Sequence, residues 1–320
     1  MDTKSTDQPQ NLVPFGRVVV LGAGAVGCYF GGMLARAGVA VTLIGRRANV
    51  EAIAGGGLFI DSVYFQQHVA VAASTEAAAA RDAELVLFCV KTPDTEAAAR
   101  ELAPHLAPGA VVVSLQNGVD NCERIRTAAG IEALPAVVYV AASLSAPGHV
   151  KHAGRGDLVI GHSGRRDDLE RVAATFARAA VPCRISDNIE GELWAKLVWN
   201  CAGNAVTALA QASYGQVARN EYSRQVMAAA ASEVVAVARA AGVQLPSVDL
   251  IAGGFKLARD LGDATSSTAQ DLARGKRTEI DALNGYVVRC GAELGVSTPV
   301  NLTLYALVKL LEENLPGRKV

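Results

Sequence analysis

The sequence is poor in aromatic side chains and carries no excess of charge of either sign. Aromatic residues make up 5% of its 320 residues, and much of its 51% hydrophobic content is alanine, which favours tightly packed helices over a β sandwich. This hydrophobic content also excludes a disordered chain. With 30 Lys+Arg against 31 Asp+Glu, the formal net charge is -1. We expect no nucleic-acid partner, because the chain has no global positive field to hold a phosphate backbone.

Long hydrophobic runs and closely spaced cysteines are also missing. Apolar runs such as Val18–Leu21 and Leu85–Val90 are far shorter than the ~20 residues of a membrane span. Residues 1–14 are polar, lack an apolar signal region, and are predicted to form a flexible tail. No Cys-x-x-Cys pair occurs, and we interpret the cysteines as buried reduced thiols (Cys28, Cys89, Cys122, Cys183, Cys201 and Cys290). We therefore predict a cytoplasmic protein with no membrane partner.

The hydrophobic pattern changes near residue 187. Before this point, short β-branched runs alternate with alanine-rich helical stretches, which indicates a mostly parallel sheet with right-handed crossovers. The predicted strands are Arg17–Leu21, Ala40–Ile44, Leu85–Val90, Ala110–Leu115, Val137–Ser143, His149–Ile160 and Val181–Ile185, with a hairpin inside His149–Gly156; helices are predicted at Val26–Ala37 and Thr95–Leu106. After it, helical periodicity dominates in Glu190–Ala212, Glu221–Ala241, Thr278–Leu294 and Asn301–Leu315. We predict an α/β domain over residues 15–187 and an all-helical domain over residues 188–320.

A glycine-rich turn follows the first predicted strand and opens the first predicted helix, with the sequence Gly22-Ala23-Gly24-Ala25-Val26-Gly27. Gly22 permits the tight turn, Gly24 lets a pyrophosphate approach the backbone, and Gly27 allows close packing of helix on strand. The helix N-terminus supplies N–H donors and a favourable dipole. Because strand, glycines and helix occur in the required order, we predict a Rossmann-type doubly wound sheet that binds a dinucleotide.

The end of the second predicted strand indicates which dinucleotide is bound. An NAD site usually carries Asp or Glu here, which accepts a hydrogen bond from the ribose 2′-hydroxyl. This chain has Arg46 and Arg47 instead. A guanidinium binds a 2′-phosphate through charge-assisted hydrogen bonds, so we predict NADP(H), held by Arg46 first and Arg47 second. The alternative is that both arginines are solvated loop residues.

Two further strand ends carry polar side chains. Leu85–Val90 runs directly into Lys91, and the strand ending at Leu115 runs into Gln116 and Asn117. Ligands of open α/β sheets bind beyond the carboxyl ends of the strands. Lys91 and Asn117 are therefore candidates for contacts with the cofactor ribose and the substrate; the alternatives are an exposed lysine and an ordinary turn asparagine.

A polar stripe lies on an otherwise apolar helix of the second half. Lys196, Asn200 and Asn204 are spaced i, i+4 and i+8 and so share one face. A lone lysine among tryptophans and alanines makes a poor solvated face, so we expect the row to face a cleft. There the lysine serves as a general acid, or as a fixed positive charge where an alkoxide develops.

Two other groups of polar residues stay ambiguous from spacing alone. Glu279 stands at the start of a predicted apolar helix, where a carboxylate stabilises the N-terminus, and Ser267 is equally well explained as a helix cap. His149, His152 and His162 lack an accompanying carboxylate cluster, so we expect no metal site.

Together these segments resemble the ketopantoate reductase family over most of the chain. The residues that carry the resemblance are the glycine turn, Arg46, Lys91, Gln116-Asn117-Gly118, the Lys196/Asn200/Asn204 row, Ser266-Ser267, and Thr278-Glu279-Ile280-Asp281 followed by Asn284-Gly285. The sequence departs from the family pattern at Ala205, where proline is common, and at Thr268, where methionine is frequent. The resemblance implies a Rossmann-type domain joined to a helical domain similar to that of 6-phosphogluconate dehydrogenase relatives.

The resemblance also implies an activity and a role for each matching residue. The activity would be NADPH-dependent reduction of 2-dehydropantoate (ketopantoate) to pantoate, in the pathway to pantothenate and coenzyme A. Lys196 would protonate the ketone oxygen, and Glu279 would assist it and contact the cofactor. Substrate contacts would come from Asn200, Asn204 and Ser267, while Lys91 and Asn117 would bridge cofactor and substrate.

Two other functions and one question of assembly stay open. The first alternative is an NADP-dependent reductase of another 2-oxo or 3-hydroxy acid. The second is a non-catalytic NADP-binding regulator, which needs neither Lys196 nor Glu279. The helices Glu221–Ala241 and Asn301–Leu315 either pack internally or form the face of a homodimer.

Overall fold

The computed structural model describes residues 13–315, so the predicted tail 1–14 lies almost entirely outside the described residues. Within this range the chain forms two compact units. The first holds residues 13–90, Arg100–Leu115 and Ile131–Asp187; the second holds Lys91–Ala99, Gln116–Gly130 and residues 188–315. Segments 91–99 and 116–130 thus continue from the first unit but belong to the second. The domain boundaries drawn from the sequence stay a prediction.

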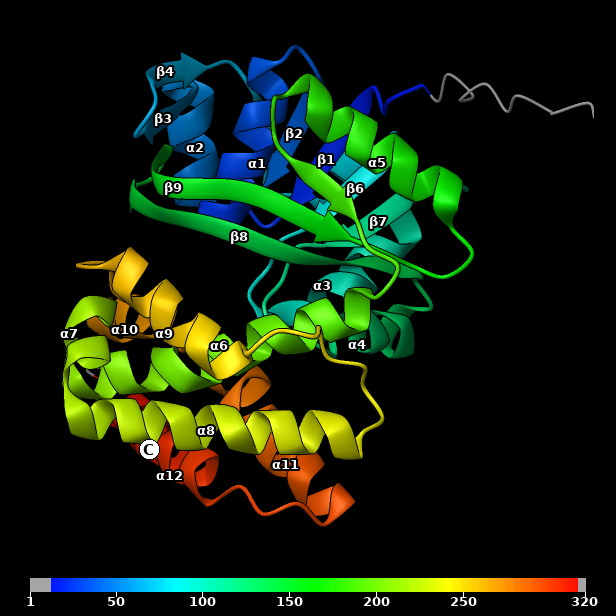
Figure 1. Ribbon diagram of the computed structural model, residues 1–320. Coiled ribbons are helices and arrows are strands. Elements are labelled where there is room, and N and C mark those ends of the chain that lie inside the picture. Colours follow the sequence, from blue (N-terminus) through cyan, green and yellow to red (C-terminus); the bar gives the residue numbers. More distant parts are fainter. Residues whose placement is uncertain (1–12, 316–320) are drawn as a thin grey trace, which may run out of the picture. The chain divides into compact units, whose positions relative to one another are not determined.

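The first unit is an α/β structure, as predicted (Figure 1). Its strands are β1 Arg17–Leu21, β2 Ala40–Ile44, β3 Leu58–Ser62, β4 Gln66–Val69, β5 Ala72–Ser74, β6 Leu85–Phe88, β7 Val111–Ser114, β8 Ala133–Ala146, β9 His149–Ile160 and β10 Cys183–Ile185. Helices α1 Ala25–Arg36, α2 Arg47–Gly56 and α5 Arg166–Arg178 belong to this unit, and α3 Thr95–Leu102 spans a boundary between the units. The sheet order is β4-β3-β9-β8-β7-β6-β1-β2-β5, with β10 paired to β9.

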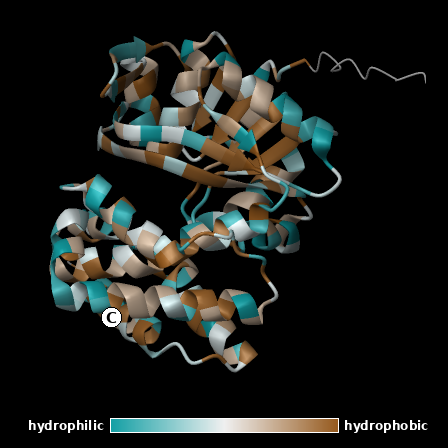
Figure 2. Ribbon diagram, viewed as in Figure 1, coloured by the Kyte–Doolittle hydropathy of each residue, from teal (hydrophilic) through white to brown (hydrophobic). Residues whose placement is uncertain are grey.

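The sheet is parallel from β5 through β8, with β8 and β9 as a long antiparallel pair. Its central strands are continuous hydrophobic runs that are buried, as expected for a sheet covered on both faces, and they stand out as brown in Figure 2. Helix α1 packs closely on the sheet because glycines on the side that faces the sheet have no side chain. A Cβ on Gly31 would lie 2.6 Å from Leu43 and 2.8 Å from Val20.

The second unit is helical, which confirms the predicted fold class. It contains α4 Asn121–Ala129, α6 Ile189–Ala210, α7 Tyr214–Arg219, α8 Glu221–Ala240, α9 Leu250–Leu261, α10 Ser267–Ala273, α11 Asn284–Leu294 and α12 Pro299–Glu313. Helix α6 is central, since it packs on α7, α8, α9, α10 and α12 (Figure 1). Helices α8 and α12 each bury one face, while α12 also exposes Leu302, Leu307 and Leu310.

Several predicted boundaries were wrong for identifiable reasons. The hairpin expected inside His149–Gly156 is a single strand, β9, and the turn to β8 lies at Pro147 and Gly148. The helix expected from Thr278 begins only at Asn284, because residues 278–283 form a turn and a short 3-10 segment. The strands β3, β4 and β5 were not predicted, because they are short and partly polar.

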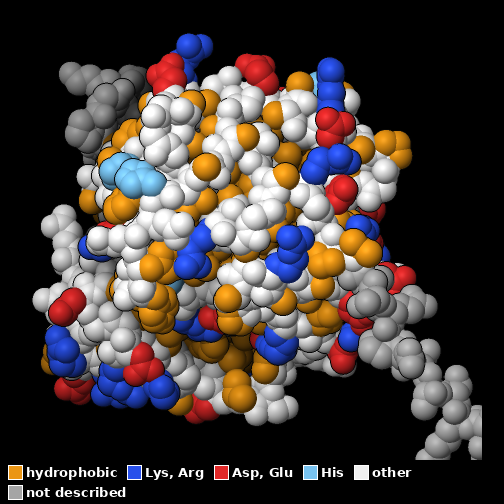
Figure 3. Space-filling view, turned by 90° about the horizontal axis from the view of Figure 1, so that it is seen from above, with side chains coloured by type: hydrophobic (Ala, Val, Ile, Leu, Met, Phe, Trp, Pro, Cys, Tyr) orange, Lys and Arg blue, Asp and Glu red, His pale blue; other side chains and the backbone are white. Residues whose placement is uncertain are grey.

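Charge and hydropathy on the described surface agree with the balanced composition. In Figure 3 the acidic and basic side chains are interspersed over the face that is seen. Across residues 13–315, no helix combines the length and the apolar character that crossing a membrane requires.

Candidate active site

The glycine turn of the first unit has the geometry of a phosphate cradle. The N–H groups of Gly22 and Ala23 both donate to the Ile44 carbonyl at 2.9 Å, which anchors the turn to the end of β2. Gly22 has φ +111, and a Cβ there would lie 2.6 Å from the backbone just after β6; a Cβ on Gly27 would overlap the Gly22 carbonyl. At Gly24, by contrast, a Cβ would meet nothing within 4 Å. The backbone at Gly24 is therefore open to a ligand, beside the first-turn N–H groups of α1 that lack intrahelical acceptors.

The two arginines predicted to select the cofactor stand where β2 ends. Arg46 is the N-cap residue of α2 and Arg47 is its first residue, and both are exposed. Arg47 lies 3.9 Å from Glu51 as an i, i+4 pair in which both side chains are largely exposed. Such a pair contributes little, so Arg47 is available to rearrange towards an anion.

Asn49 supports the glycine turn and was missed by the sequence analysis. Its side chain is buried; Nδ2 donates to the Ala23 carbonyl at 2.7 Å, and Oδ1 accepts from the Gly148 N–H at 2.6 Å. It therefore joins α2, the glycine turn and the β8–β9 turn. Only its position shortly after the arginines could have signalled this role.

The polar stripe of α6 runs from half-buried to fully buried. Lys196 and Asn200 are half-buried, whereas Asn204 is 4% exposed. The Lys196 Nζ donates to Asn117 Oδ1 at 2.9 Å. Asn204 Oδ1 accepts from the Tyr214 hydroxyl at 2.7 Å. The structure thus brings Lys196 and Asn117 together, although 79 residues separate them, and it engages Asn204 with Tyr214.

Glu279 is the most buried charged group of this cluster, at 6% exposure. Its Oε1 accepts from the backbone N–H and the hydroxyl of Thr92, both at 3.0 Å. Its Oε2 accepts from Asn117 Nδ2 at 3.2 Å and lies 3.6 Å from Lys91 Nζ. Burial acts to raise the pKa of Glu279, but the charge of Lys91 and these donors outweigh it and hold the pKa below its usual value. Glu279 is therefore an ionised acceptor at neutral pH, and Asn117 links it to Lys196.

Lys91 lies between two carboxylates. Besides Glu279, its Nζ contacts Asp271 Oδ2 at 2.8 Å. Burial acts to lower the pKa of Lys91, but Glu279 and Asp271 outweigh it and raise the pKa. Burial raises the pKa of Asp271, against the opposing effect of Lys91. Lys91 is therefore a fixed cation, and Asp271 is a member of the cluster that the sequence analysis did not select.

The serine pair divides its roles differently from what the sequence predicted. Ser266 is the N-cap of α10 and is buried; its hydroxyl accepts from the Ala269 N–H at 3.1 Å and donates to the Asn204 carbonyl at 3.1 Å. Ser267 is the first helical residue and is exposed. The interpretation of Ser267 as the cap was therefore wrong, since Ser266 occupies that position.

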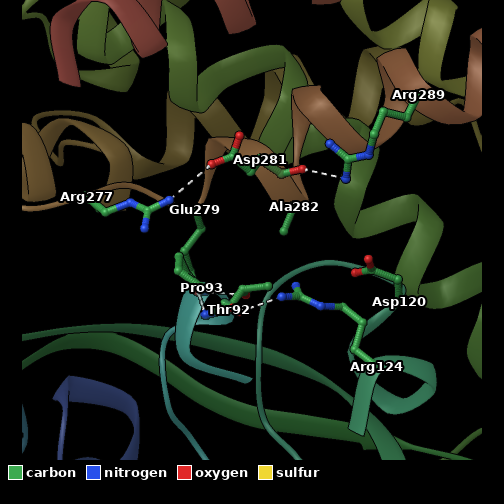
Figure 4. A pocket seen from close by; sticks show the side chains of 9 residues that line it. All are labelled: Thr92, Pro93, Asp120, Arg124, Arg277, Glu279, Asp281, Ala282 and Arg289. Atoms are coloured by element: carbon green, nitrogen blue, oxygen red, sulfur yellow. Dashed lines mark hydrogen bonds and ion pairs between the residues drawn. The ribbon is translucent and has the colours of Figure 1, made fainter. Parts of the chain in front are cut away.

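A cavity of about 370 Å³ adjoins Glu279 in the second unit (Figure 4). Its lining comprises Thr92, Pro93, Asp120, Arg124, Arg277, Glu279, Asp281, Ala282 and Arg289. Asp120 Oδ1 is buried there without a hydrogen-bond partner, and burial raises the pKa of this carboxyl. Arg124, which lines the cavity, donates to the Thr92 carbonyl at 3.0 Å. It therefore helps to hold Thr92, which donates to Glu279.

Of the three histidines considered from the sequence, His152 takes a structural position, whereas His149 and His162 are exposed. His152 is 1% exposed, lies 2.9 Å from the Ser62 hydroxyl through Nδ1, and stacks on Tyr29 with ring centroids 4.4 Å apart. Among the residues that the structure describes, no group of three or more His, Cys, Asp or Glu side chains is arranged to hold a metal ion.

Comparison with known proteins gives consistent matches over most of the chain. The family described as "Ketopantoate reductase PanE/ApbA" matches residues 18–165, and its C-terminal part matches residues 188–312. A 2-dehydropantoate 2-reductase from Pyrococcus abyssi is 33% identical, over 95% of this chain and 100% of that protein. The crystal structure of a PanE/ApbA family ketopantoate reductase from Ralstonia eutropha JMP134 is 49% identical, with a TM-score of 0.88 over 93% of this chain and 99% of that one. A D-mandelate dehydrogenase in complex with NADH and anilino(oxo)acetate shares the fold, with a TM-score of 0.86 over 93% and 99% of the chains, at 23% identity.

Proposed function

The chain belongs to the ketopantoate reductase PanE/ApbA family, a family of oxidoreductases that use a nicotinamide cofactor, and from this premise we propose that it reduces 2-dehydropantoate to pantoate with NADPH. The observation that carries the proposal is a series of two hydrogen bonds, from Lys196 to Asn117 and from Asn117 to Glu279. Through one amide, these bonds link an ammonium group to a buried, ionised carboxylate. A protein that only bound a cofactor would need no such arrangement.

NADP(H) is the proposed cofactor, and the residues of the first unit fit it. The open backbone at Gly24 and the first turn of α1 would hold the pyrophosphate. Arg46 and Arg47 would bind the 2′-phosphate, since no carboxylate stands at the end of β2 to repel it. The bound cofactor supplies the hydride.

Lys196 is the proposed general acid. Hydride addition at C2 of a 2-oxo acid builds negative charge on the ketone oxygen, which a preorganised cation stabilises. Of the three N–H donors of Lys196, one is directed to Asn117 Oδ1 and so fixes where the ammonium group lies. A second donor would transfer its proton to the developing alkoxide.

Glu279, Asn117 and Lys91 have supporting roles in this proposal. Glu279 accepts from Asn117 Nδ2, which orients the amide so that its oxygen faces Lys196. Glu279 therefore orients the Lys196 ammonium group through the Asn117 amide, without contacting the lysine itself. Lys91, held charged by Glu279 and Asp271, would provide a positive charge to an anionic cofactor or substrate group.

Asn200, Asn204 and Ser267 are the proposed contacts to the substrate carboxylate and hydroxyl groups. Asn200 is half-buried one turn from Lys196, and Ser267 is exposed at the start of α10. Asn204 Oδ1 is engaged with Tyr214, so its amide nitrogen is the group that would donate to a substrate oxygen.

A different 2-oxo acid is the second candidate substrate. The D-mandelate dehydrogenase shows that this fold occurs in a protein named for another hydroxy acid. Because fold alone does not specify a substrate, the choice rests on measured turnover.

The deciding experiment measures NADPH oxidation by the purified protein with 2-dehydropantoate and a panel of aliphatic and aromatic 2-oxo acids. We expect the highest kcat/KM for 2-dehydropantoate. Selective turnover of another acid would replace the substrate in the proposal. Binding of NADPH without turnover of any acid would instead favour a non-catalytic regulator.

A further inference from the structure

The short segment that carries Glu279 is fixed by the last turns of α12. Glu312 Oε1 accepts from the Thr278 backbone N–H at 2.6 Å and from the Thr278 hydroxyl at 2.7 Å. Two residues beyond Glu279, Asp281 accepts from the Tyr305 hydroxyl at 2.7 Å and from Lys309 Nζ at 2.9 Å. Side chains of one helix therefore hold the backbone immediately before Glu279 and the side chain shortly after it.

Glu312 is a buried carboxylate that the proposed reaction does not use. It is 2% exposed. Burying a carboxylate is costly unless it is paired and hydrogen-bonded, and here Lys309 Nζ completes the set at 3.0 Å from Oε2. Lys309 also bonds Asp281, so Glu312, Lys309 and Asp281 form one connected network around the turn.

Thr278 and Glu279 lie in no helix or strand, just before the short 3-10 segment Ile280–Ala282. The Thr278 hydroxyl also accepts from the Ile280 N–H at 3.1 Å, across Glu279, and the next helix begins only at Asn284. The position of the Glu279 backbone therefore depends on how Thr278 is held. Its carboxylate must meet Thr92 and Asn117 at 3.0 and 3.2 Å, and small displacements break such contacts.

We propose that Glu312 is a positioning residue for the reaction: through Thr278 it sets where the Glu279 carboxylate lies, and so the orientation of Asn117 towards Lys196. This inference rests on the role given to Glu279 in the proposed function. Glu312 touches neither substrate nor cofactor in it. Its effect on turnover passes entirely through Glu279.

The test variant is Glu312→Gln, which keeps the size of the side chain and breaks the network in either amide orientation. With its oxygen towards Thr278, the amide nitrogen faces the ammonium group of Lys309, donor against donor. With its nitrogen towards Thr278, it faces the two donors of that residue. The first orientation detaches Lys309 and leaves Thr278 held only by a neutral acceptor, and the second removes the acceptor of both Thr278 donors.

Glu233→Gln on α8 is a matched control, because Glu233 binds the other end of α12. Glu233 accepts from the backbone N–H groups of Val300 and Asn301 at 2.9 Å and from Asn301 Nδ2 at 2.7 Å. It therefore fixes α12 with the same chemistry, but it holds no part of the Glu279 turn. Urea unfolding of both variants measures their loss of stability, and kinetics are compared at a temperature where both are folded.

The expected result is a loss of kcat on the order of tenfold to a hundredfold in Glu312→Gln, with a smaller change in KM. Glu233→Gln should keep kcat within about twofold of the wild type. In a background that already carries Glu279→Gln, the Glu312→Gln change should lower kcat no further, because the carboxylate it positions is gone. Additive losses in the double variant would overturn the inference, and so would a wild-type kcat in Glu312→Gln.

A second pair of variants protects the test if Glu312→Gln does not fold. Thr278→Val removes the hydroxyl that Glu312 holds, while Thr278→Ser keeps it. The serine variant should retain most of the kcat that the valine variant loses, and equal kcat values in the two would contradict the inference. If Glu279→Gln itself left kcat unchanged, the role of Glu279 in the proposed function would fail, and the inference with it. Normal turnover confined to Glu312→Gln would overturn the inference alone.

Discussion

At the residue scale, Lys196 is the side chain on which the proposed reaction depends most directly. Replacing Lys196 with alanine removes the cation that stabilises the developing alkoxide, and we expect kcat to fall by roughly 10²–10⁴. Steady-state NADPH oxidation measures this loss. Lys256→Ala is the control, since Lys256 is an exposed lysine on α9 that pairs with Asp260 at 2.7 Å. A Lys196→Ala variant that turned over like the control would remove the general acid from the proposal.

Glu279 gives a second prediction at this scale, in the dependence of stability on pH. Its pKa is lowered in the folded protein, so its ionised form contributes stability that is fully present above the unfolded pKa of about 4.3 and is lost as the pH falls through the folded value. At pH 7, Glu279→Gln should lower the free energy of unfolding by about 1–3 kcal/mol, because buried donors lose a charged acceptor.

The pH series itself is the measurement. Urea unfolding of the wild type and of Glu279→Gln between pH 7 and about pH 3 should show the difference shrinking below the unfolded pKa. The raised pKa of Asp271 has the opposite effect on stability; the part of it that the charge of Glu279 causes is removed in Glu279→Gln, and the rest is common to both proteins. A difference that stayed constant down to pH 3 would contradict the ionised, hydrogen-bonded state assigned to Glu279.

A sequence pattern predicted site residues only where it fixes how those residues lie relative to one another. The spacing on α6 indicated that Lys196, Asn200 and Asn204 share a face, because helical geometry fixes that relation. No pattern of this kind relates Glu279 to Thr92, which is 187 residues away along the chain. Asp271 was overlooked for the same reason, since its partner Lys91 is 180 residues distant.

At the scale of elements, regular patterns predicted the structure well and short polar segments did not. Strands β1 and β2 lie where the sequence placed them, because buried parallel strands are continuous β-branched runs bounded by turns. The strand β4, with three exposed residues in four, has no such run. The helix expected from Thr278 begins only at Asn284, after the 3-10 segment Ile280–Ala282, and both donors of Thr278 bind Glu312 instead of forming part of a helix.

The turn between β1 and α1 gives a prediction that separates folding from cofactor binding. Gly24→Ala should change the free energy of unfolding by less than about 0.5 kcal/mol, since its Cβ meets nothing within 4 Å, yet it should weaken NADPH binding at least about tenfold by occupying the cradle. Gly27→Ala should instead destabilise the fold by about 1–3 kcal/mol, because its Cβ overlaps the Gly22 carbonyl. Urea unfolding and NADPH titration of both variants provide the comparison. Unchanged NADPH affinity in Gly24→Ala would argue against a pyrophosphate at this position.

The junction of β2 and α2 gives the prediction for cofactor choice. Arg46→Ala should raise the Kd for NADPH by about 10- to 150-fold and leave the Kd for NADH nearly unchanged, because a charge-assisted hydrogen bond to the 2′-phosphate contributes about 1.5–3 kcal/mol. Titrations with both cofactors measure the two constants. Arg166→Ala on α5 is the control, as Arg166 is an exposed arginine paired with Glu170. Equal weakening for both cofactors would contradict the assignment of NADP(H).

At the scale of the whole molecule, the chain passes between its two compact units after residues 90, 99, 115, 130 and 187. The segments 91–99 and 116–130 continue from β6 and β7 of the first unit, and they supply Thr92 and Asn117 to Glu279 in the second. Each segment is anchored at both ends in the first unit, so unfolding of that unit would free these ends and weaken the hold of Thr92 and Asn117 on the buried carboxylate. The units should therefore unfold together.

The two tryptophans make this cooperativity measurable. Trp194 and Trp199 both lie on α6, so tryptophan fluorescence reports the second unit alone, whereas far-UV circular dichroism reports both units. We expect the two probes to give the same urea midpoint, the usual test of a single transition.

NADPH at a hundredfold excess over its Kd should add about 2.7 kcal/mol to the free energy of unfolding. Because the cofactor is proposed to bind the first unit and the tryptophans lie in the second, the fluorescence midpoint should rise together with the dichroism midpoint. In Arg46→Ala the same NADPH concentration should produce a much smaller rise in both. Separate midpoints, or a dichroism shift without a fluorescence shift, would show that the connecting segments do not couple the units.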